Sequence, residues 1–291
     1  MISPDELQAL DLLIWLRTGK SAGHHLGCNQ STISRRVEQV QRVLQVDLKR
    51  VRGDWWVHGN TLLLELERQV HQLYRCLGRA PLRLEASFPV SSRLLNPAPD
   101  GWISGLHDEI GPRRSLRLLR YRVIDAWLAT SVDELPADAI EEFAVFDLYR
   151  APVQLMAASD HPLASVKGLT QADLERFPSM ALPDGWYPRT ANHLRSQGLW
   201  TMPERDGRYD ESSWETRRSE ELTLSYATPN LRERGPHLVP LDWDLGLHAV
   251  ESLVVHQTLL EQPAIAHLVE EIRRRARVEV SLFPELELLE P

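Results

Sequence analysis

The sequence is poor in cysteine and has no long apolar run. Cys28 and Cys76 are its only cysteines, so a disulfide framework is excluded and a reducing cytoplasm is favoured. No run of about 18 apolar residues occurs, so no membrane span is expected. The stretch MISPDELQALDLL is acidic and lacks the charged-then-apolar plan of a secretory signal. We therefore expect a cytoplasmic protein with no membrane partner.

Motifs for metal binding or phosphate chemistry are also missing. The sequence has no phosphate-binding loop and no zinc motif. His24, His25 and Cys28 are close in sequence, but no fourth ligand is in view, so we expect no metal site. His161, in the stretch DHPLA, is better explained by a turn than by catalysis, and Cys76 by a buried thiol in a helix than by a redox switch. We expect a protein that is not an enzyme and uses no cofactor.

The charge is distributed unevenly along the chain. The net charge of -8 by itself argues against a nucleic-acid binder. Residues 1–80, however, hold 11 Lys and Arg against 8 Asp and Glu, which leaves +3 there and -11 on the rest. Residues 33–52 alone carry six basic side chains against Glu38 and Asp47. A basic head on an acidic body suggests a nucleic-acid module attached to a second unit.

The first 44 residues predict three helices. Apolar residues at helical spacing predict one helix over 5–16, and a second runs from Thr18 as N-cap to about Leu26. A third begins at Asn29, whose side chain can accept from free amides of the first turn. In this third helix, the apolar side chains form one stripe and the polar ones the opposite face. The stripe is Ile33, Val37, Val40 and Leu44, and the opposite face is Ser31, Ser34, Arg35, Glu38 and Arg42.

A hairpin and a fourth helix follow. The stretch DLKRVRGDWWVHGN, residues 47–60, alternates on either side of Arg52-Gly53-Asp54, which predicts a tight hairpin. One helix is predicted over residues 61–77, ended by Gly78 and Pro81 at a hinge. Its apolar seam has the 4-4-3-4 spacing that suits a partner helix; the alternative is packing against the chain's own head. The seam residues, our candidates for dimerisation, are Leu62, Leu66, Val70, Leu73 and Leu77.

The rest of the chain alternates strand-like and helix-like pieces, an α/β pattern without internal repeats. Residues 203–221 are expected to form a loop or a frayed helix. The expected strands are LRLEAS (82–87), SLRLLRY (115–121), DAWLAT (125–130), APVQLMAA (151–158) and LTLSYAT (222–228). The expected helices are TQADLERF (170–177), YPRTANHLRSQG (187–198) and AIAHLVEEIRRRA (264–276).

This ordered series resembles the LysR-type transcriptional regulators over essentially the whole chain. In the head, T-x-x-x-A-G-x-x-L-x-x-N-Q-S-T-I-S-R-R-V (18–37) looks like the family's helix-turn-helix pattern, and LQVDLKRVRG (44–53) like the entry into the wing. In the body, ASDHPLA (158–164) and GLTQADLERFPSMALPDG (168–185) continue the match.

The resemblance implies a mostly α, N-terminal winged helix-turn-helix, a long linker helix, and a two-lobed α/β effector domain like a periplasmic binding protein. We expect the DNA-binding domain over 1–60, the linker and hinge over 61–80, and the effector domain over 81–291. Within that domain, lobe 1 would comprise about 82–153 and 247–291, and lobe 2 about 154–246.

Four departures from the family pattern stand out. The loop before Thr18 is shorter than usual, and Gln45 stands where a glycine normally ends the recognition helix. Prolines interrupt FPVSSRLLNPAPDG (88–101), usually a long first effector helix. The helix that normally precedes LTLSYATP is not recognisable in 203–221. The body therefore resembles a reduced or divergent effector domain.

For DNA, a helix fits the major groove, and Arg or Gln in its N-terminal half can pair with base edges. The alternative for one such polar face is ordinary solvation; helix two, the wing and the charge split favour DNA. Gln30, Ser31, Ser34 and Arg35 are expected to contact bases. Thr32, Arg36, Arg50 and Arg52 are better placed for phosphates, and Arg42 lies further along the same face.

The resemblance also implies a small-molecule site between the two lobes. Strand ends rich in Ser and Thr are equally ordinary loops, and the hydroxyls there suggested a small polar or anionic effector. The positions that match are Ser87, Ser91, Thr130, Ser131, Asp184, Tyr187, Ser225 and Tyr226.

The sequence thus predicts a homodimeric or tetrameric regulator on an inverted-repeat site, with RNA polymerase as a further candidate partner. Two alternatives remain open. In one, the body answers to a protein partner instead of a small ligand. In the other, a solute-binding or enzymatic α/β protein carries a non-functional head.

Overall fold

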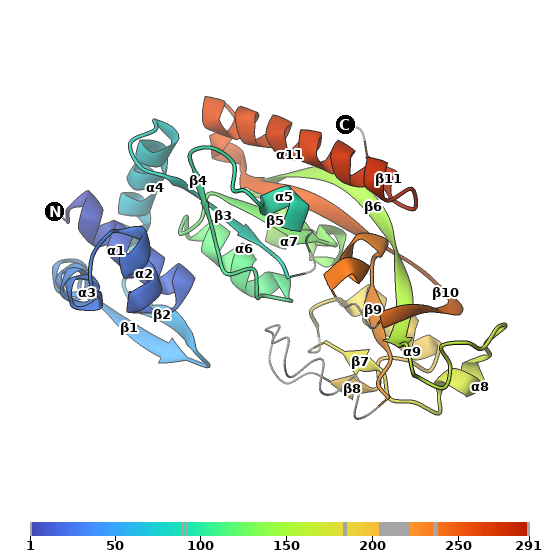
Figure 1. The fold of residues 1–291 in the computed structure, drawn as a ribbon. Coiled ribbons are helices and arrows are strands. Elements are labelled where there is room, and N and C mark those ends of the chain that lie inside the picture. Colours follow the sequence, from blue (N-terminus) through green and yellow to red (C-terminus); the bar gives the residue numbers. More distant parts are fainter. Residues whose placement is uncertain are drawn as a thin grey trace.

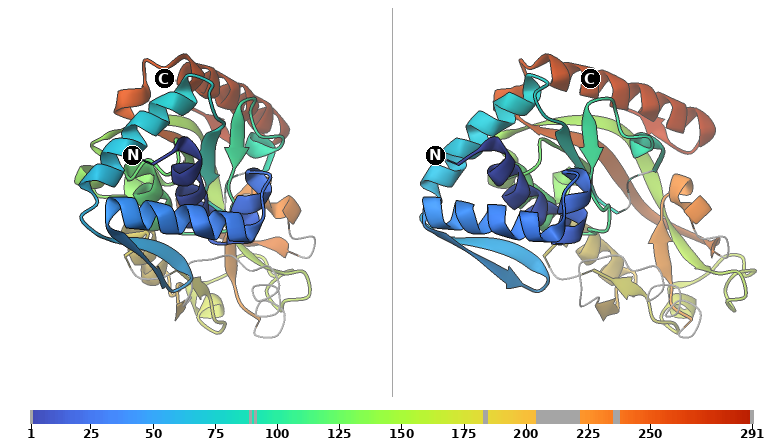
Figure 2. Two further views of the ribbon diagram at one scale, coloured as in Figure 1. Left: turned by 90° about the vertical axis from the view of Figure 1, so that its left-hand side faces the viewer. Right: turned by 60° about the vertical axis from the view of Figure 1, so that its left-hand side comes forward.

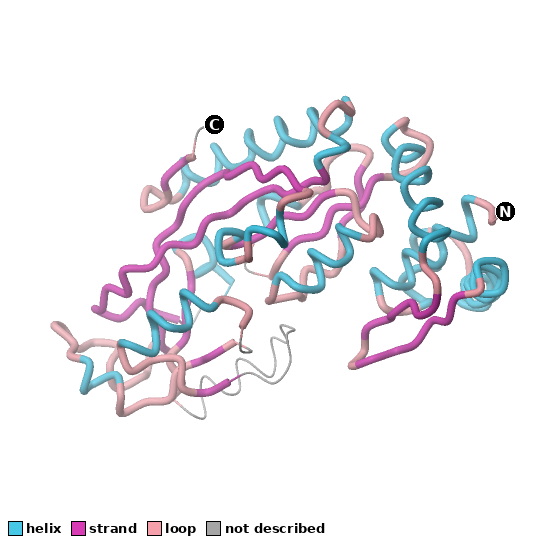
Figure 3. The backbone as a smooth tube through the Cα atoms, turned by 180° about the vertical axis from the view of Figure 1, so that it is seen from behind, coloured by secondary structure: helices cyan, strands magenta, loops and turns pink. Residues whose placement is uncertain are grey.

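The computed structural model describes residues 2–88, 90, 92–182, 185–203, 222–234 and 238–289. Figure 1 shows a small helical head with a two-stranded wing, one connecting helix, and a larger α/β body. Figure 3 shows from behind how the connecting helix runs from the wing to the body. No helix in the described part of the chain is both long and apolar enough to cross a membrane.

The head contains the three predicted helices, and the predicted caps begin the second and third. The Thr18 side chain accepts from the Ser21 amide, and the Asn29 side chain accepts from the Thr32 amide. Each cap satisfies an amide that has no partner within the helix. The helices are α1 (Pro4–Leu16), α2 (Gly19–His25) and α3 (Gln30–Leu44).

The wing is the predicted hairpin. Strands β1 (Val46–Val51) and β2 (Asp54–Gly59) are antiparallel and leave a two-residue turn. Arg52 and Gly53 in this turn have φ of 50° and 83°, the left-handed conformation of tight hairpins. Gln45 ends α3 with φ 54° and ψ 44°, so a residue with a side chain makes the turn where the family usually has glycine.

The connecting helix α4 (Leu62–Cys76) has one buried and one exposed face. The buried face is largely polar and includes Arg68, Gln72 and Arg75. The five seam residues are exposed: Leu62 62%, Leu66 50%, Val70 64%, Leu73 47% and Leu77 72%. The interpretation that this seam packs against the chain's own head is therefore wrong.

The body is built on one mixed sheet in the order β11-β6-β10-β5-β3-β4, with β9 paired to β6. Strand β3 is parallel to β4 and β5, whereas β10 is antiparallel to β5 and β6. The two longest strands, β6 and β10, extend from one lobe into the other (Figure 1). The strands are β3 (Leu82–Ala86), β4 (Trp102–Ser104), β5 (Ala126–Thr130), β6 (Phe143–Ala158), β9 (Ser225–Ala227), β10 (Leu238–His256) and β11 (Glu287–Leu288).

Short helices and one long helix complete the body. The long helix α11 (Pro263–Leu282) lies along the sheet at the top of Figure 1. Lobe 2 also contains a small parallel pair, β7 (Met180–Ala181) and β8 (Met202–Pro203). The remaining helices are α5 (Ser92–Leu95), α6 (Pro112–Arg120), α7 (Ala137–Ile140), α8 (Gln171–Leu174) and α9 (Pro188–Ser196).

Among the longer elements, two differ from the sequence prediction. The stretch 115–121, expected as a strand, lies in helix α6 and its C-cap, with Leu116 and Leu119 buried on one side. Leucines and arginines alternate there over too few residues to separate the two periods. No sequence pattern predicted strand β10. Bulges at Pro240/Asp244 and Asp244/His248 break the alternation of inward and outward side chains along this strand. The prediction for 203–221 falls almost wholly outside the described residues.

The apolar cores do not follow the boundary between head and body. One core combines Leu10, Ile14 and Ile33 of the head with Leu118 and Trp127 of lobe 1. A second core lies between α11 and the sheet, and a third lies within lobe 2. The predicted domain limits stay predictions, and we keep "lobe 1" and "lobe 2" as names for the residue ranges given above.

Candidate nucleic-acid interface and interlobe cleft

Helix α3 lies on the side of the head that points away from the body (Figure 2), and its polar face is exposed to solvent. Ser31, Ser34 and Arg35 are exposed, while Ile33 and Val37 of the same helix are buried. Asn29 fixes the start of this face, because its Oδ1 accepts from the hydroxyls of Ser31 (2.8 Å) and Thr32 (2.9 Å). The predicted base-reading residues therefore share one accessible surface.

The individual side chains differ in how freely they can move. The Arg35 side chain lies back along its helix, its Nε 3.3 Å from the Ser31 carbonyl oxygen, and is exposed. Arg36 donates to Asp5 of α1 at 2.8 Å, so it must leave a carboxylate to reach a phosphate. Gln30 packs against Gly19, where an added Cβ would be 2.8 Å from the Gln30 Cγ. Gly19 thus lets α2 approach the start of α3.

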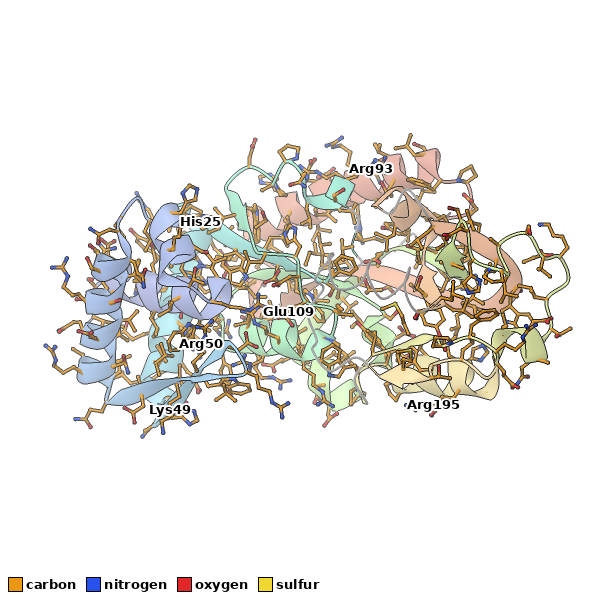
Figure 4. All side chains as sticks on the ribbon, turned by 60° about the horizontal axis from the view of Figure 1, so that its bottom comes forward. His25, Lys49, Arg50, Arg93, Glu109 and Arg195 are labelled. Carbon is orange, nitrogen blue, oxygen red and sulfur yellow. The ribbon has the colours of Figure 1, made fainter. Side chains whose placement is uncertain are left out.

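Basic side chains continue onto the wing. Arg50 lies over the Trp55 ring at 5.7 Å and donates to the Gly53 carbonyl, and Arg52 is exposed at the tip of the turn. Lys49, which is not among the predicted DNA contacts, is exposed on the same strand (Figure 4). The charge count along residues 33–52 could have indicated it. Arg42 is exposed near the far end of α3, where it donates to Gln39.

A cavity of about 190 Å³ opens between the two lobes. Lobe 1 contributes Phe88 and Ile110, and lobe 2 contributes Met180, Leu194 and Trp200. The Trp200 and Tyr226 rings lie 6.1 Å apart in its wall. The full lining is Phe88, Ile110, Thr130, Ser131, Val153, Met180, Ala181, Leu182, Tyr187, Thr190, Leu194, Trp200, Tyr226, Ala227, Thr228, Leu231, His248, Ala249 and Glu251.

Half of the predicted effector residues line this cavity, namely Thr130, Ser131, Tyr187 and Tyr226. Ser87 and Ser225 do not; both are buried, and the Ser87 hydroxyl accepts from Trp127 Nε1 at 3.2 Å. Their strand ends turn these side chains into the core instead of the cleft. Ser91 and Asp184 lie outside the described residues.

The cavity is mostly apolar, with one buried carboxylate. Glu251 is 3% exposed, and its two oxygens accept from the Thr130 hydroxyl at 2.9 and 3.0 Å. The Tyr187 hydroxyl donates to the Ile110 carbonyl, and burial raises the pKa of Tyr226 to about 12. Both phenols therefore stay neutral at physiological pH. Sequence reasoning missed Glu251 and Trp200, because neither β10 nor the segment before β8 matched a pattern.

Catalytic chemistry finds no geometric support at the one stretch whose spacing suggests it. Residues 19–23, GKSAG, have the Gly-x-Ser-x-Gly spacing of hydrolase nucleophile elbows. An elbow places its serine between a strand and a helix, whereas Ser21 lies inside α2 with its hydroxyl 2.7 Å from that of Thr18. This serine belongs to a helix cap.

The remaining reactive side chains are structural. Burial raises the pKa of Cys76 to about 11, so the thiol is protonated at neutral pH and poorly suited to a redox switch. His161 accepts from the Leu163 amide through Nδ1, as expected for a turn. Within the described residues, no three His, Cys, Asp or Glu side chains are grouped as a metal would require.

No protein-family model matches the chain. A curated relative, a probable nitrogen assimilation transcriptional activator of Synechococcus elongatus, is 28% identical over 203 residues. The match covers 62% of this chain and 64% of that protein's length.

Solved structures match nearly the whole chain. Full-length OxyR of Pseudomonas aeruginosa has a TM-score of 0.57 at 14% identity, covering 94% of this chain and 95% of its own. ArgP of Mycobacterium tuberculosis has a TM-score of 0.54 at 16% identity, covering 95% and 97%. CbnR in complex with its target DNA has a TM-score of 0.54 at 15% identity, and the match covers 94% of this chain and 100% of CbnR.

These matches show that the fold is a winged helix-turn-helix joined to a two-lobed α/β domain. It is the fold of the LysR-type transcriptional regulators, and the resemblance seen in the sequence is confirmed.

Proposed function

We propose that this protein is a transcriptional regulator that binds a specific inverted-repeat DNA site as a homodimer. The carrying observation is the exposed polar face of α3, fixed by the Asn29 cap and flanked by the basic wing. Gln30, Ser31, Ser34 and Arg35 would contact base edges. Thr32, Arg36, Arg50, Arg52 and the added Lys49 would contact phosphates, with Arg42 beside them. The likeness to CbnR, solved with its target DNA, supports this assignment.

The first experiment selects bound duplexes from a random pool at two salt concentrations. We expect enrichment of a two-fold site and affinity that falls with salt, because basic side chains displace counterions from phosphates. Arg35→Ala is expected to lower affinity for that site by about 10- to 100-fold, the range for a lost base contact.

Arg52→Ala is the matched control, since it removes the same charge from the wing tip. It should weaken binding to all sequences alike and leave the preferred site unchanged. If the wild type enriches no site at either salt concentration, the proposal fails and the idle-head alternative gains support.

We further propose that the interlobe cleft binds a largely apolar, ring-containing effector. The lining supports this, because aliphatic side chains surround the Trp200 and Tyr226 rings. No lysine or arginine is found among its described lining residues to pair with an anionic ligand. The small anionic effector suggested by the strand-end hydroxyls is thus disfavoured. An open cavity also gives the protein-partner alternative no support.

Two dyes that share the same ring system and differ in charge test this preference. N-phenyl-1-naphthylamine is neutral, and 1-anilinonaphthalene-8-sulfonate adds one negative charge. We expect the neutral dye to bind about tenfold more tightly, because a mostly apolar lining with no described lysine or arginine does not offset the cost of removing the sulfonate from water. Fluorescence titration measures both affinities.

Trp200→Ala should weaken the binding of both dyes, because it removes one of the two rings from the cavity wall. Tighter binding of the sulfonate to the wild type would refute the proposed ligand class without touching the DNA-binding proposal.

A further inference from the structure

The head is held against lobe 1 by a buried arginine. Arg17 ends α1 with φ 64° and is only 6% exposed. Its Nε donates to Asp54 of the wing at 3.0 Å, and its Nη1 donates to Asp108 of the body at 2.9 and 2.7 Å. Its Nη2 donates to Glu109. One guanidinium therefore joins the turn end of the wing to two consecutive acids of the body.

Further polar contacts surround this arginine. Trp15 Nε1 donates to Glu85 of β3 at 2.6 Å. Arg114 of α6 donates in the other direction, to the Trp15 carbonyl at 2.6 Å and to Asp54 at 3.1 Å. Figure 4 shows Glu109 at the junction of head and body. Because the apolar core also runs through this junction, the head and lobe 1 pack as one unit.

The two acids that hold Arg17 belong to a segment that also forms the cleft wall. Asp108 and Glu109 are followed directly by Ile110, which lines the cavity. The Tyr187 hydroxyl of lobe 2 donates to the Ile110 carbonyl at 2.8 Å. The Phe88 amide, beside the same cavity, donates to the Glu109 carbonyl at 2.7 Å. Three successive residues thus contact the head on one side and the cleft on the other.

A glycine at each end fits this segment tightly between the two parts. A Cβ at Gly105 would be 2.6 Å from the Glu85 carboxylate that accepts from Trp15. A Cβ at Gly111 would overlap the Trp186 ring of lobe 2. Residues 105–111 therefore have little room to shift without displacing a contact of the head or of lobe 2.

We propose that residues 105–111 couple the interlobe cleft to the DNA-binding head. A ligand that displaces Ile110, or a lobe movement that pulls on its carbonyl, shifts Asp108 and Glu109 and with them Arg17. Arg17 is directly followed by Thr18, the cap of α2, against which α3 packs. The signal thus passes through this contact and not through free rotation at residues 78–81. Its effect on transcription rests on the function proposed above.

Hydrogen–deuterium exchange of the full-length protein, without DNA or ligand, tests the coupling. Ile110→Ala removes a side chain that faces the cleft and leaves Arg17 and its partners intact. We expect it to raise amide exchange in residues 14–26 about tenfold, because the acids lose their rigid support. Asp108→Asn with Glu109→Gln should raise exchange there at least as much. The milder Arg17→Lys should do so too and keeps the test available if that pair fails to fold.

Leu194→Ala is the matched control, because it removes the same number of carbons from the lobe 2 side of the same cavity. It should raise exchange in α9 and leave residues 14–26 within twofold of the wild type. If Ile110→Ala also leaves amide exchange in residues 14–26 unchanged, the proposed coupling is wrong. If the Asp108/Glu109 and Arg17 variants leave it unchanged, these ion pairs do not hold the head against lobe 1. Neither result depends on DNA binding, so failure here differs from failure of the proposed function.

Discussion

Replacing Asp11 with alanine is expected to lower the free energy of unfolding by about 3–5 kcal/mol, the usual cost of leaving a buried charge without its partner. Asp11 of α1 is 0% exposed. It accepts from Arg68 Nε of α4 at 2.8 Å and from Arg83 Nη1 of β3 at 3.2 Å. One carboxylate therefore joins the head, the connecting helix and the body. Removing it leaves two buried arginines, 4% and 2% exposed, without this carboxylate.

Urea unfolding followed by tryptophan fluorescence measures this change. Asp5→Ala is the control, because Asp5 lies on the same helix and also pairs with an arginine, Arg36, at 2.8 Å. Asp5 is exposed, so its loss should cost about 0–1 kcal/mol. Equal effects of the two substitutions would show that the buried pairs do not hold the three parts together.

The head could be predicted almost completely because its signals are local. Thr18 and Asn29 are caps whose partners lie three residues further on. The buried stripe of α3 recurs at the helical period, and the wing turn lies between two alternating segments. Each of these features is decided by neighbours within one turn of helix or one hairpin.

The attachment of the head could not be predicted, because its partners are far apart in sequence. Arg17 and Asp108 are separated by 91 residues, and Trp15 and Glu85 by 70. No periodicity links such pairs. In the sequence, Arg17, Asp108 and Glu85 look like ordinary surface charges. The resemblance pointed instead to a hinge near Gly78. The shorter loop before Thr18 was the one departure located near this contact, since it brings Arg17 to the end of α1.

The cleft was half predictable for a related reason. The resemblance places strand ends around it, and Thr130 and Tyr226 do line the cavity. It cannot say which way a serine at a strand end points, and Ser87 and Ser225 point into the core. The chemical character of the cleft comes from side chains such as Val153 and Trp200, which only the fold brings together. Hydroxyls alone therefore suggested a more polar ligand than the lining supports.

The exposed seam of α4 gives the second large effect, on assembly. Leu62, Leu66, Val70, Leu73 and Leu77 form a continuous apolar stripe of the kind that marks a protein interface. The buried face of the same helix carries Arg68, which binds Asp11 of the head, and Arg75, which binds Asp125 of the body, so the apolar stripe is free for a second copy. A two-fold pairing here would place two copies of α3 on one DNA duplex.

Val70→Asp, at the centre of the stripe and 64% exposed, is expected to convert the dimer to a monomer, because two carboxylates would face each other in an apolar contact. The affinity for the inverted-repeat site should then fall by about a hundredfold or more, since each head binds without the high effective concentration of its partner. Sedimentation velocity measures the assembly, and fluorescence anisotropy measures the affinity. Val166→Asp, which adds the same charge at an exposed valine of lobe 2, should change neither the assembly nor the affinity.

A Val70→Asp protein that still sediments as a dimer would place the interface elsewhere. A monomeric wild type that binds the site with full affinity would instead make each head sufficient alone, and the two-fold arrangement would be wrong.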